Sequence, residues 1–150
     1  MVILRLSSFK EHFLIFNYYM DNIDWELEAK LKEICKEVYN EVGFWYNEVC
    51  NQRCMEILLQ ENKVEYTTEV VLPYKFKNKV FGYGRLDIKL DNIIIELKCI
   101  AKLTVVEENQ LKNYLKHCDD AYYGYLIGFN KNKLEMVRIS KSGDITKISV

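Results

Sequence analysis

The hairpin predicted over residues 85–99 constrains the fold more than any other part of the chain. Its first strand alternates polar and apolar side chains, Asp91-Asn92 is a two-residue turn signal, and its second strand is rich in isoleucine. If those two residues form the turn, Leu90 pairs with Ile93. A strand as apolar as the second one is typical of the centre of a sheet. A charged side chain in such a strand seldom lacks a role.

This turn also fixes which charged residues face each other. Asp87 lies opposite Glu96, and Arg85 lies opposite Lys98. Because side chains alternate between the two faces of a strand, all four are expected on the same face of the sheet. The pattern predicts an acid pair with cations beside it.

Two facing carboxylates repel each other and destabilise a partly buried hairpin unless a cation lies between them. Lys98 and a divalent metal are the candidates, and carboxylate oxygens suit Mg²⁺. A metal would stabilise charge on a phosphate, while Lys98 would orient or deprotonate an attacking water. The alternative is a solvated, salt-bridged surface. The apolar setting of Glu96 favours the hydrolytic site.

The remaining patterns predict an α/β (α+β) domain in which helices flank a mixed sheet. Apolar residues at helical spacing indicate helices over residues 23–42, ending near Gly43, and about 47–61. Thr104 and Glu107 form a capping box that opens a helix to about His117. β-Branched and apolar runs predict strands over residues 64–72, 74–81 around a Lys77-Asn78-Lys79 turn, 122–129, 134–139 and 145–150.

The length and composition suit one domain over residues 1–150, with a short N-terminal extension over about residues 1–22. No segment is long and apolar enough to predict a membrane span. The five cysteines lie in apolar periodic segments, so we expect reduced core thiols in an intracellular protein that is not secreted. Their spacing favours packing over a zinc site.

Positive charge is concentrated late in the chain. Residues 1–61 hold 6 basic and 11 acidic side chains, whereas residues 62–150 hold 15 and 11, although the whole chain has a net charge of −1. A basic run interleaved with aromatic residues precedes the predicted acid pair: Lys75, Lys77, Lys79 and Arg85. These cations could follow a phosphate backbone, or the alternating lysines could protect a hairpin edge from aggregation.

Three segments resemble the PD-(D/E)XK nuclease superfamily, and most closely its GxxExxY branch. They are Gly84-Arg-Leu-Asp87, Ile94-Ile-Glu96-Leu-Lys98 and Glu108-Asn-Gln110-Leu-Lys-Asn-Tyr114-Leu. Upstream, Glu37-Val-Tyr-Asn-Glu-Val-Gly43 and the strand of residues 64–70 also match, so the resemblance covers about residues 30–140. The superfamily implies a restriction-endonuclease-like core and metal-dependent phosphodiester hydrolysis.

The resemblance implies a role for each matching residue. Asp87 and Glu96 would bind the metal, with the main-chain carbonyl of Leu97 as a further ligand. Lys98 would act on the attacking water. Gln110 would face the site from the following helix. A helix glutamate, Glu48 or alternatively Glu56, would support the metal, because the register of the branch motif is ambiguous here. Trp45 and Asn51 replace the glycine and tyrosine of that motif.

The sequence therefore predicts a nuclease that depends on Mg²⁺, with Mn²⁺ as a substitute, and that acts on DNA rather than RNA. The alternative is a nucleic-acid-binding or protein-interaction module that kept the fold without turnover, which the departures at Trp45 and Asn51 favour. The exposed aromatic residues also allow a homodimer. No membrane partner is expected.

Overall fold

The structure is a computed structural model that describes residues 10–11, 13–14 and 23–150. The predicted N-terminal extension therefore lies almost entirely outside the described residues. The elements follow the chain in this order: α2 (Trp25–Glu41), α3 (Glu48–Glu61), β1 (Thr67–Phe76), β2 (Lys79–Leu90), β3 (Ile93–Lys98), α4 (Val105–His117), β4 (Tyr123–Phe129), β5 (Leu134–Ser140) and β6 (Ile145–Ile148).

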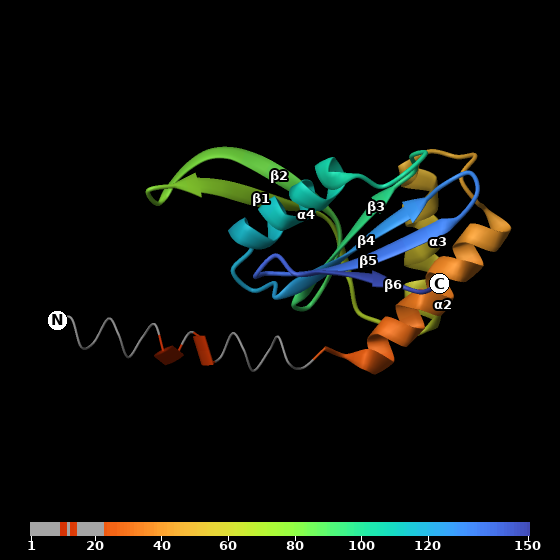
Figure 1. The fold of residues 1–150 in the computed structure, drawn as a ribbon, viewed down its shortest axis with the longest axis horizontal. Helices are drawn as coiled ribbons and strands as arrows, with labels where there is room; N and C mark the ends of the chain where they lie inside the picture. Colours follow the sequence, from red (N-terminus) through yellow and green to blue (C-terminus); the bar gives the residue numbers. More distant parts are fainter. Residues whose placement is uncertain (1–9, 12, 15–22) are drawn as a thin grey trace.

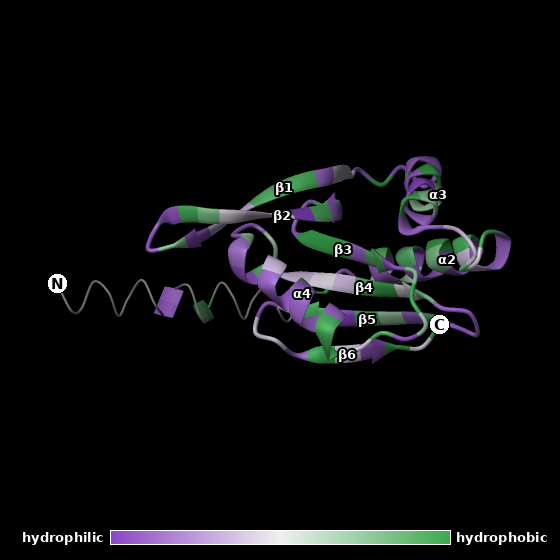
Figure 2. Ribbon diagram, turned by 90° about the horizontal axis from the view of Figure 1, so that it is seen from above, coloured by the Kyte–Doolittle hydropathy of each residue, from purple (hydrophilic) through white to green (hydrophobic). Residues whose placement is uncertain are grey.

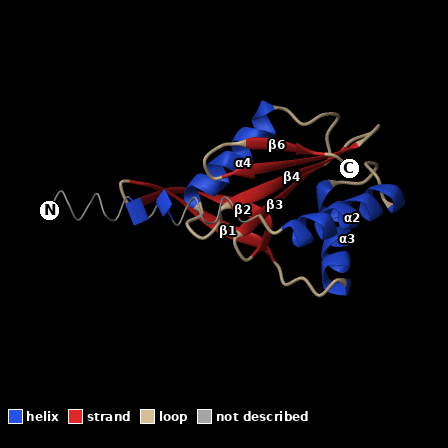
Figure 3. Ribbon diagram, turned by 60° about the horizontal axis from the view of Figure 1, so that its bottom comes forward, coloured by secondary structure: helices blue, strands red, loops and turns tan. Residues whose placement is uncertain are grey.

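The six strands form one sheet in the order β1-β2-β3-β4-β5-β6. Only the β3–β4 pair is parallel, and α4 provides the crossover that this pairing requires. Helix α4 covers one face of the sheet, and α2 and α3 cover the other (Figures 1 and 3). This confirms the predicted mixed sheet flanked by helices.

Two apolar cores lie on the two faces of the sheet. Leu31, Met55 and Leu59 of the helices pack with β3 and β4 on the α2–α3 side. Leu111 and Leu115 of α4 pack with the opposite face. Strands β3 and β4 have apolar side chains buried on both faces, as expected for a parallel pair between helical layers.

Local signals place the helix ends where the sequence predicts them. Asn47 caps α3 by accepting a hydrogen bond from the Cys50 N–H. Thr104 and Glu107 form the predicted capping box at the start of α4. After α2, Gly43 takes a φ of 70°, a conformation that glycine adopts without steric cost.

The cysteine prediction is correct only in part. Cys35 and Cys118 are buried and Cys54 and Cys99 are half-buried, but Cys50 is exposed. The reason is that Cys50 lies on the outer side of the first turn of α3, where the next residues, Asn51 and Gln52, are the buried ones. All five are free thiols.

Strands β1 and β2 extend beyond the rest of the sheet as a two-stranded hairpin. Residues 70–86, which we call the arm, project past α4 (Figures 1 and 2). Its turn residues, Lys77 and Asn78, both have positive φ, as a type I′ turn requires. The pairing confirms the predicted Lys77-Asn78-Lys79 turn, and β2 continues without interruption to Leu90.

Candidate active site

The β2–β3 hairpin has the predicted register. Leu90 pairs with Ile93 and Ile88 pairs with Ile95 around the Asp91-Asn92 turn. The ladder ends there, and the two strands separate at the next pair, which is Asp87 and Glu96. Beyond this point β2 remains paired with β1, while β3 remains paired with β4. The sheet therefore forks where the two acids face each other.

The two carboxylates replace the ladder hydrogen bonds that the fork removes. The Asp87 N–H donates to Glu96 Oε1 over 3.2 Å, and the Leu97 N–H donates to Asp87 Oδ2 over 2.9 Å. Each acid is therefore positioned by the main chain of the opposite strand. These bonds satisfy N–H groups that the separated strands would otherwise leave without a partner.

Burial makes both acids reluctant to ionise, and the charge of Asp87 adds to this effect at Glu96. Glu96 is only 2% exposed, and burial, followed by the charge of Asp87, raises its pKa to about 9. Burial also raises the pKa of Asp87; the Leu97 N–H and Lys98 oppose this, and the charge of Glu48 adds to it. The pair therefore favours binding a proton or another cation.

Lys98 follows Glu96 by two residues and is half-buried. Its positive charge lowers the pKa of both acids. It makes no hydrogen bond or ion pair with a described residue, so its ammonium group remains available to a water molecule or a substrate. Arg85 does not pair with Lys98 as predicted, because β2 and β3 separate before that position; it forms an ion pair with Glu69 of β1 over 2.5 Å.

The two candidate glutamates of α3 have different surroundings. Glu48 Oε2 accepts a hydrogen bond from the Cys99 N–H over 3.3 Å, just after β3 ends. Its charge also acts on Asp87. Glu56, two turns later, accepts hydrogen bonds from Arg53 and from Gln52. The structure therefore brings Glu48 to the acid pair and leaves Glu56 occupied with neighbours on its own helix.

Gln52 lies between these glutamates and was not predicted as a site residue. It is buried, and its amide nitrogen donates to Glu56 Oε1 at 3.1 Å, to Glu69 Oε1 at 3.2 Å and to the main-chain oxygen of Asp87 at 3.3 Å. It therefore joins α3 to β1 and β2 at the fork, just outside the arm. Its one sequence signal is the four-residue spacing from Glu48 and Glu56, which places the three on one helix face.

Gln110 of α4 is connected to the acid pair through Tyr114. Its amide nitrogen donates to the hydroxyl of Tyr114 over 2.9 Å. Burial, followed by the charge of Glu96, raises the pKa of Tyr114 to about 12. Gly84 leaves room for this ring, because a Cβ there would lie 2.9 Å from Tyr114 Cε1 and 2.2 Å from the Tyr74 hydroxyl.

The predicted nucleic-acid contacts lie apart from the acids. Lys75, Lys77 and Lys79 are exposed at the end of the arm. Eight residues of extended strand separate Lys79 from Asp87, or about 26 Å. The structure therefore does not bring these lysines to the acid pair, although β2 connects them to it directly.

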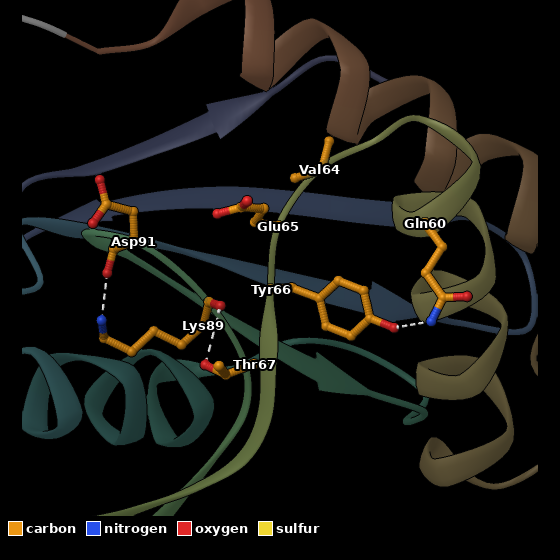
Figure 4. Close-up of a pocket in the computed structure, with 7 residues that line it drawn as sticks. All are labelled: Gln60, Val64, Glu65, Tyr66, Thr67, Lys89 and Asp91. Atoms are coloured by element: carbon orange, nitrogen blue, oxygen red, sulfur yellow. Dashed lines mark hydrogen bonds between the residues drawn. The ribbon is translucent and has the colours of Figure 1, made fainter.

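A surface cavity at the other end of β2 contains none of these site residues. It measures about 980 Å³ and is lined by Gln60, Val64, Glu65, Tyr66, Thr67, Lys89 and Asp91 (Figure 4). Its polar groups bond to each other: Gln60 donates to Tyr66 over 2.6 Å, and Lys89 donates to the Asp91 carbonyl. It is a wide surface hollow with no convergent chemical groups.

The donor set suits a divalent metal, although no complete metal cage is present. Among the described residues, no group of three or more His, Cys, Asp or Glu side chains is arranged to hold a metal ion. Mg²⁺, however, is commonly bound by one or two carboxylates together with water. Asp87 and Glu96 provide such a pair, and a cation between them would favour the ionised carboxylates that burial disfavours.

A mixed sheet between helices, with facing acids and a lysine at its fork, defines a restriction-endonuclease-like domain. The family model of the PD-(D/E)XK nuclease superfamily matches residues 25–139. The chain therefore belongs to this superfamily, whose members are in general nucleases.

A solved structure has the same fold. The crystal structure of SSO0001 aligns with a TM-score of 0.51 and 19% sequence identity, over 94% of this chain and 78% of that one. At this identity the likeness shows the fold alone. No curated protein matches the chain significantly. In the part of the chain that the structure describes, no helix is long and apolar enough to cross a membrane.

Proposed function

We propose that the protein is a metal-dependent nuclease of the GxxExxY branch that hydrolyses phosphodiester bonds in nucleic acid, and in DNA rather than RNA. The observation that supports this most is the facing pair of Asp87 and Glu96 at the fork, with the ammonium group of Lys98 two residues away. A purely structural role does not account for a buried and a half-buried acid that face each other and whose pKa values burial raises.

Asp87 and Glu96 would hold Mg²⁺ or Mn²⁺, with Glu48 and the main-chain carbonyl of Leu97 as further oxygen donors. Such a cation supplies Lewis-acid stabilisation of the charge that develops on the phosphate. Main-chain hydrogen bonds from Leu97 and Asp87 already hold the two carboxylates toward each other. The acids therefore need little rearrangement to act together.

Lys98 is the group that would act on the attacking water. Its amine has no hydrogen-bonding partner among the described residues, and it lies near both acids. As an ammonium group it would donate a hydrogen bond that orients the water, and only as a neutral amine would it accept the water's proton. Gln110 and Tyr114 form the wall of α4 next to Glu96, where the amide and hydroxyl can position a phosphate or a water molecule.

The test uses purified protein with single- and double-stranded DNA and RNA, in Mg²⁺, in Mn²⁺ and in EDTA. We expect metal-dependent cleavage of at least one substrate, reduced about 100-fold or more in Asp87→Asn and Lys98→Ala. Asp91→Asn in the adjacent turn and the exposed Lys102→Ala are matched controls that should cleave normally. Cleavage that persists in Asp87→Asn, or that ignores EDTA, would contradict the proposal.

A binding module without turnover is the second candidate, and α3 favours it. Asn51 stands where the branch motif has tyrosine; it is buried, and its amide donates to the Gly43 carbonyl over 2.7 Å. Trp45, in place of the motif glycine, is exposed. Retained nucleic-acid binding with no cleavage of any substrate in either metal would support this candidate.

A further inference from the structure

We infer that the arm, residues 70–86, is a binding surface for single-stranded nucleic acid that leads along β2 to Asp87. The inference deepens the proposed function, because it names the form of the substrate. Its binding step, however, can be measured without any cleavage. Three independent features of the arm support it: how it is held, what it exposes and how it is charged.

One face of the arm is anchored on α4. Leu72, Tyr74 and Leu86 pack with the apolar residues of that helix. The Tyr74 ring lies 4.9 Å from the ring of His117, and the Lys75 N–H donates to His117 Nδ1 over 3.4 Å. These contacts hold the arm against the body of the protein, so a ligand on its free surface would meet a largely preformed shape.

The rest of the arm exposes apolar side chains, which the neighbouring described residues leave largely open to solvent. Phe76, Phe81 and Tyr83 are each about two-thirds exposed, at 67%, 65% and 69%. Tyr83 pairs with Pro73, and Arg85 pairs with Val71, which is also exposed. Along β2, Tyr83, Arg85 and Asp87 follow each other at the two-residue period of one strand face.

The arm is strongly cationic in a chain that is slightly acidic overall. It contains no acidic residue and four cations, of which Lys75, Lys77 and Lys79 are exposed and Arg85 is paired with Glu69 just outside the arm, whereas the whole chain has a net charge of −1. The Lys77 ammonium lies 5.6 Å from the centre of the Phe76 ring, so cation and aromatic surface occur together. This charge favours a polyanion as the occupant.

Exposed rings among cations favour unpaired bases over a duplex. A duplex presents phosphates but hides the faces of its bases, whereas a single strand offers both phosphates and stacking surfaces. A second copy of the chain is disfavoured, because two arms of equal positive charge repel each other. Pro73 and the alternating lysines also block edge-to-edge pairing of β1. Single-stranded nucleic acid satisfies the charge and the aromatic surface together.

The experiment measures the fluorescence anisotropy of a labelled 20-nucleotide DNA or RNA, single-stranded or duplex, in EDTA. We expect the full chain to bind the single strand more tightly than the duplex of the same sequence. Tyr83→Ala and Phe76→Ala should each weaken single-strand binding about fivefold or more. Trp25→Ala, an equally exposed aromatic residue at the start of α2, is the matched control and should bind normally.

A triple alanine variant of Lys75, Lys77 and Lys79 should weaken binding and flatten its salt dependence, compared with the same change at Lys131, Lys133 and Lys147. Equal affinity for single strand and duplex, or unchanged binding in both aromatic variants, would overturn the inference. So would a concentration-dependent dimer in sedimentation velocity that Tyr83→Ala abolishes. Tight single-strand binding without cleavage in Mg²⁺ would support the arm and contradict only the proposed hydrolysis.

Discussion

The two halves of β2 show how one strand serves two environments. From Lys79 to Arg85 the side chains are exposed or half-buried, and from Leu86 to Leu90 every second side chain is buried. The first half pairs only with β1, whereas the second half lies between β1 and β3. The change occurs at Asp87, where β3 leaves. The candidate site therefore lies at the boundary between the arm and the core, where the sheet opens.

The buried half and the exposed half of β2 therefore contribute to function at different costs in stability. Burying Asp87 and Glu96 together opposes folding, because both pKa values are raised. The exposed lysines of the arm have no such penalty, since water solvates them. Substitutions of these two acids should therefore lower activity without lowering stability, whereas substitutions of the lysines at the end of the arm should change binding alone.

The largest effect is expected at Glu96. Glu96→Gln should reduce metal-dependent hydrolysis about 100-fold or more, because it removes one of the two carboxylates that would hold the metal. The same variant should not lose stability, since its side-chain oxygen can still accept the Asp87 N–H. Cleavage assays and urea denaturation of the same preparation test both parts, and a destabilised Glu96→Gln protein would contradict the second.

The stability difference should depend on pH in a defined direction. The pKa of Glu96 is about 9 in the folded protein and near 4.5 in the unfolded chain, so its ionisation opposes folding as pH rises between these values. In EDTA, Glu96→Gln should match the wild type near pH 4 and be more stable by about 1–3 kcal/mol at pH 8. Urea denaturation at several pH values measures this, and an advantage that shrinks with rising pH would refute it.

The two glutamates of α3 should differ in their effect on hydrolysis. Glu48→Gln should reduce hydrolysis about 10- to 100-fold, because Glu48 reaches the end of β3 and acts on Asp87. Glu56→Gln should have a much smaller effect, because its partners lie on its own helix. Steady-state kinetics of both variants decide between them. A larger loss in Glu56→Gln would reverse the assignment.

Two glycines of the arm offer a matched pair. Gly84→Ala should destabilise the protein by about 1–3 kcal/mol, because its Cβ would overlap Tyr74 and Tyr114. Gly82→Ala should have little effect, since its Cβ would lie at an ordinary 3.6 Å from the Tyr74 ring. Thermal unfolding measures both, and equal stability of the two variants would show that the arm is not packed on α4 as described.

Gln52 tests the connection between α3 and the fork. Gln52→Leu should cost about 1–2 kcal/mol, because three acceptor oxygens lose a shared donor. Gln60→Leu, an exposed position on the same helix, should lie within about 0.5 kcal/mol of wild type. Denaturant titration compares them. Indistinguishable variants would mean that these hydrogen bonds contribute nothing measurable.

Most of the fold could be predicted because its signals are local. The capping box at Thr104, the turn at Asp91-Asn92 and the apolar run of β4 each specify their own element, and all three occur as predicted. The facing of Asp87 and Glu96 follows from the same turn. What failed depended on tertiary packing: Arg85 bonds to Glu69 of β1, and Cys50 lies on a side of α3 that the core does not cover.

The order of residues alone determined the elements, the hairpin register and the two acids that face each other, because turns and alternation act over a few residues. Where the sheet forks, which helix glutamate reaches Asp87 and that Gln52 joins α3 to β1 and β2 depend on the tertiary structure. Those features depend on how layers far apart in the chain pack together, and side-chain reach across a packed interface is not encoded in local spacing.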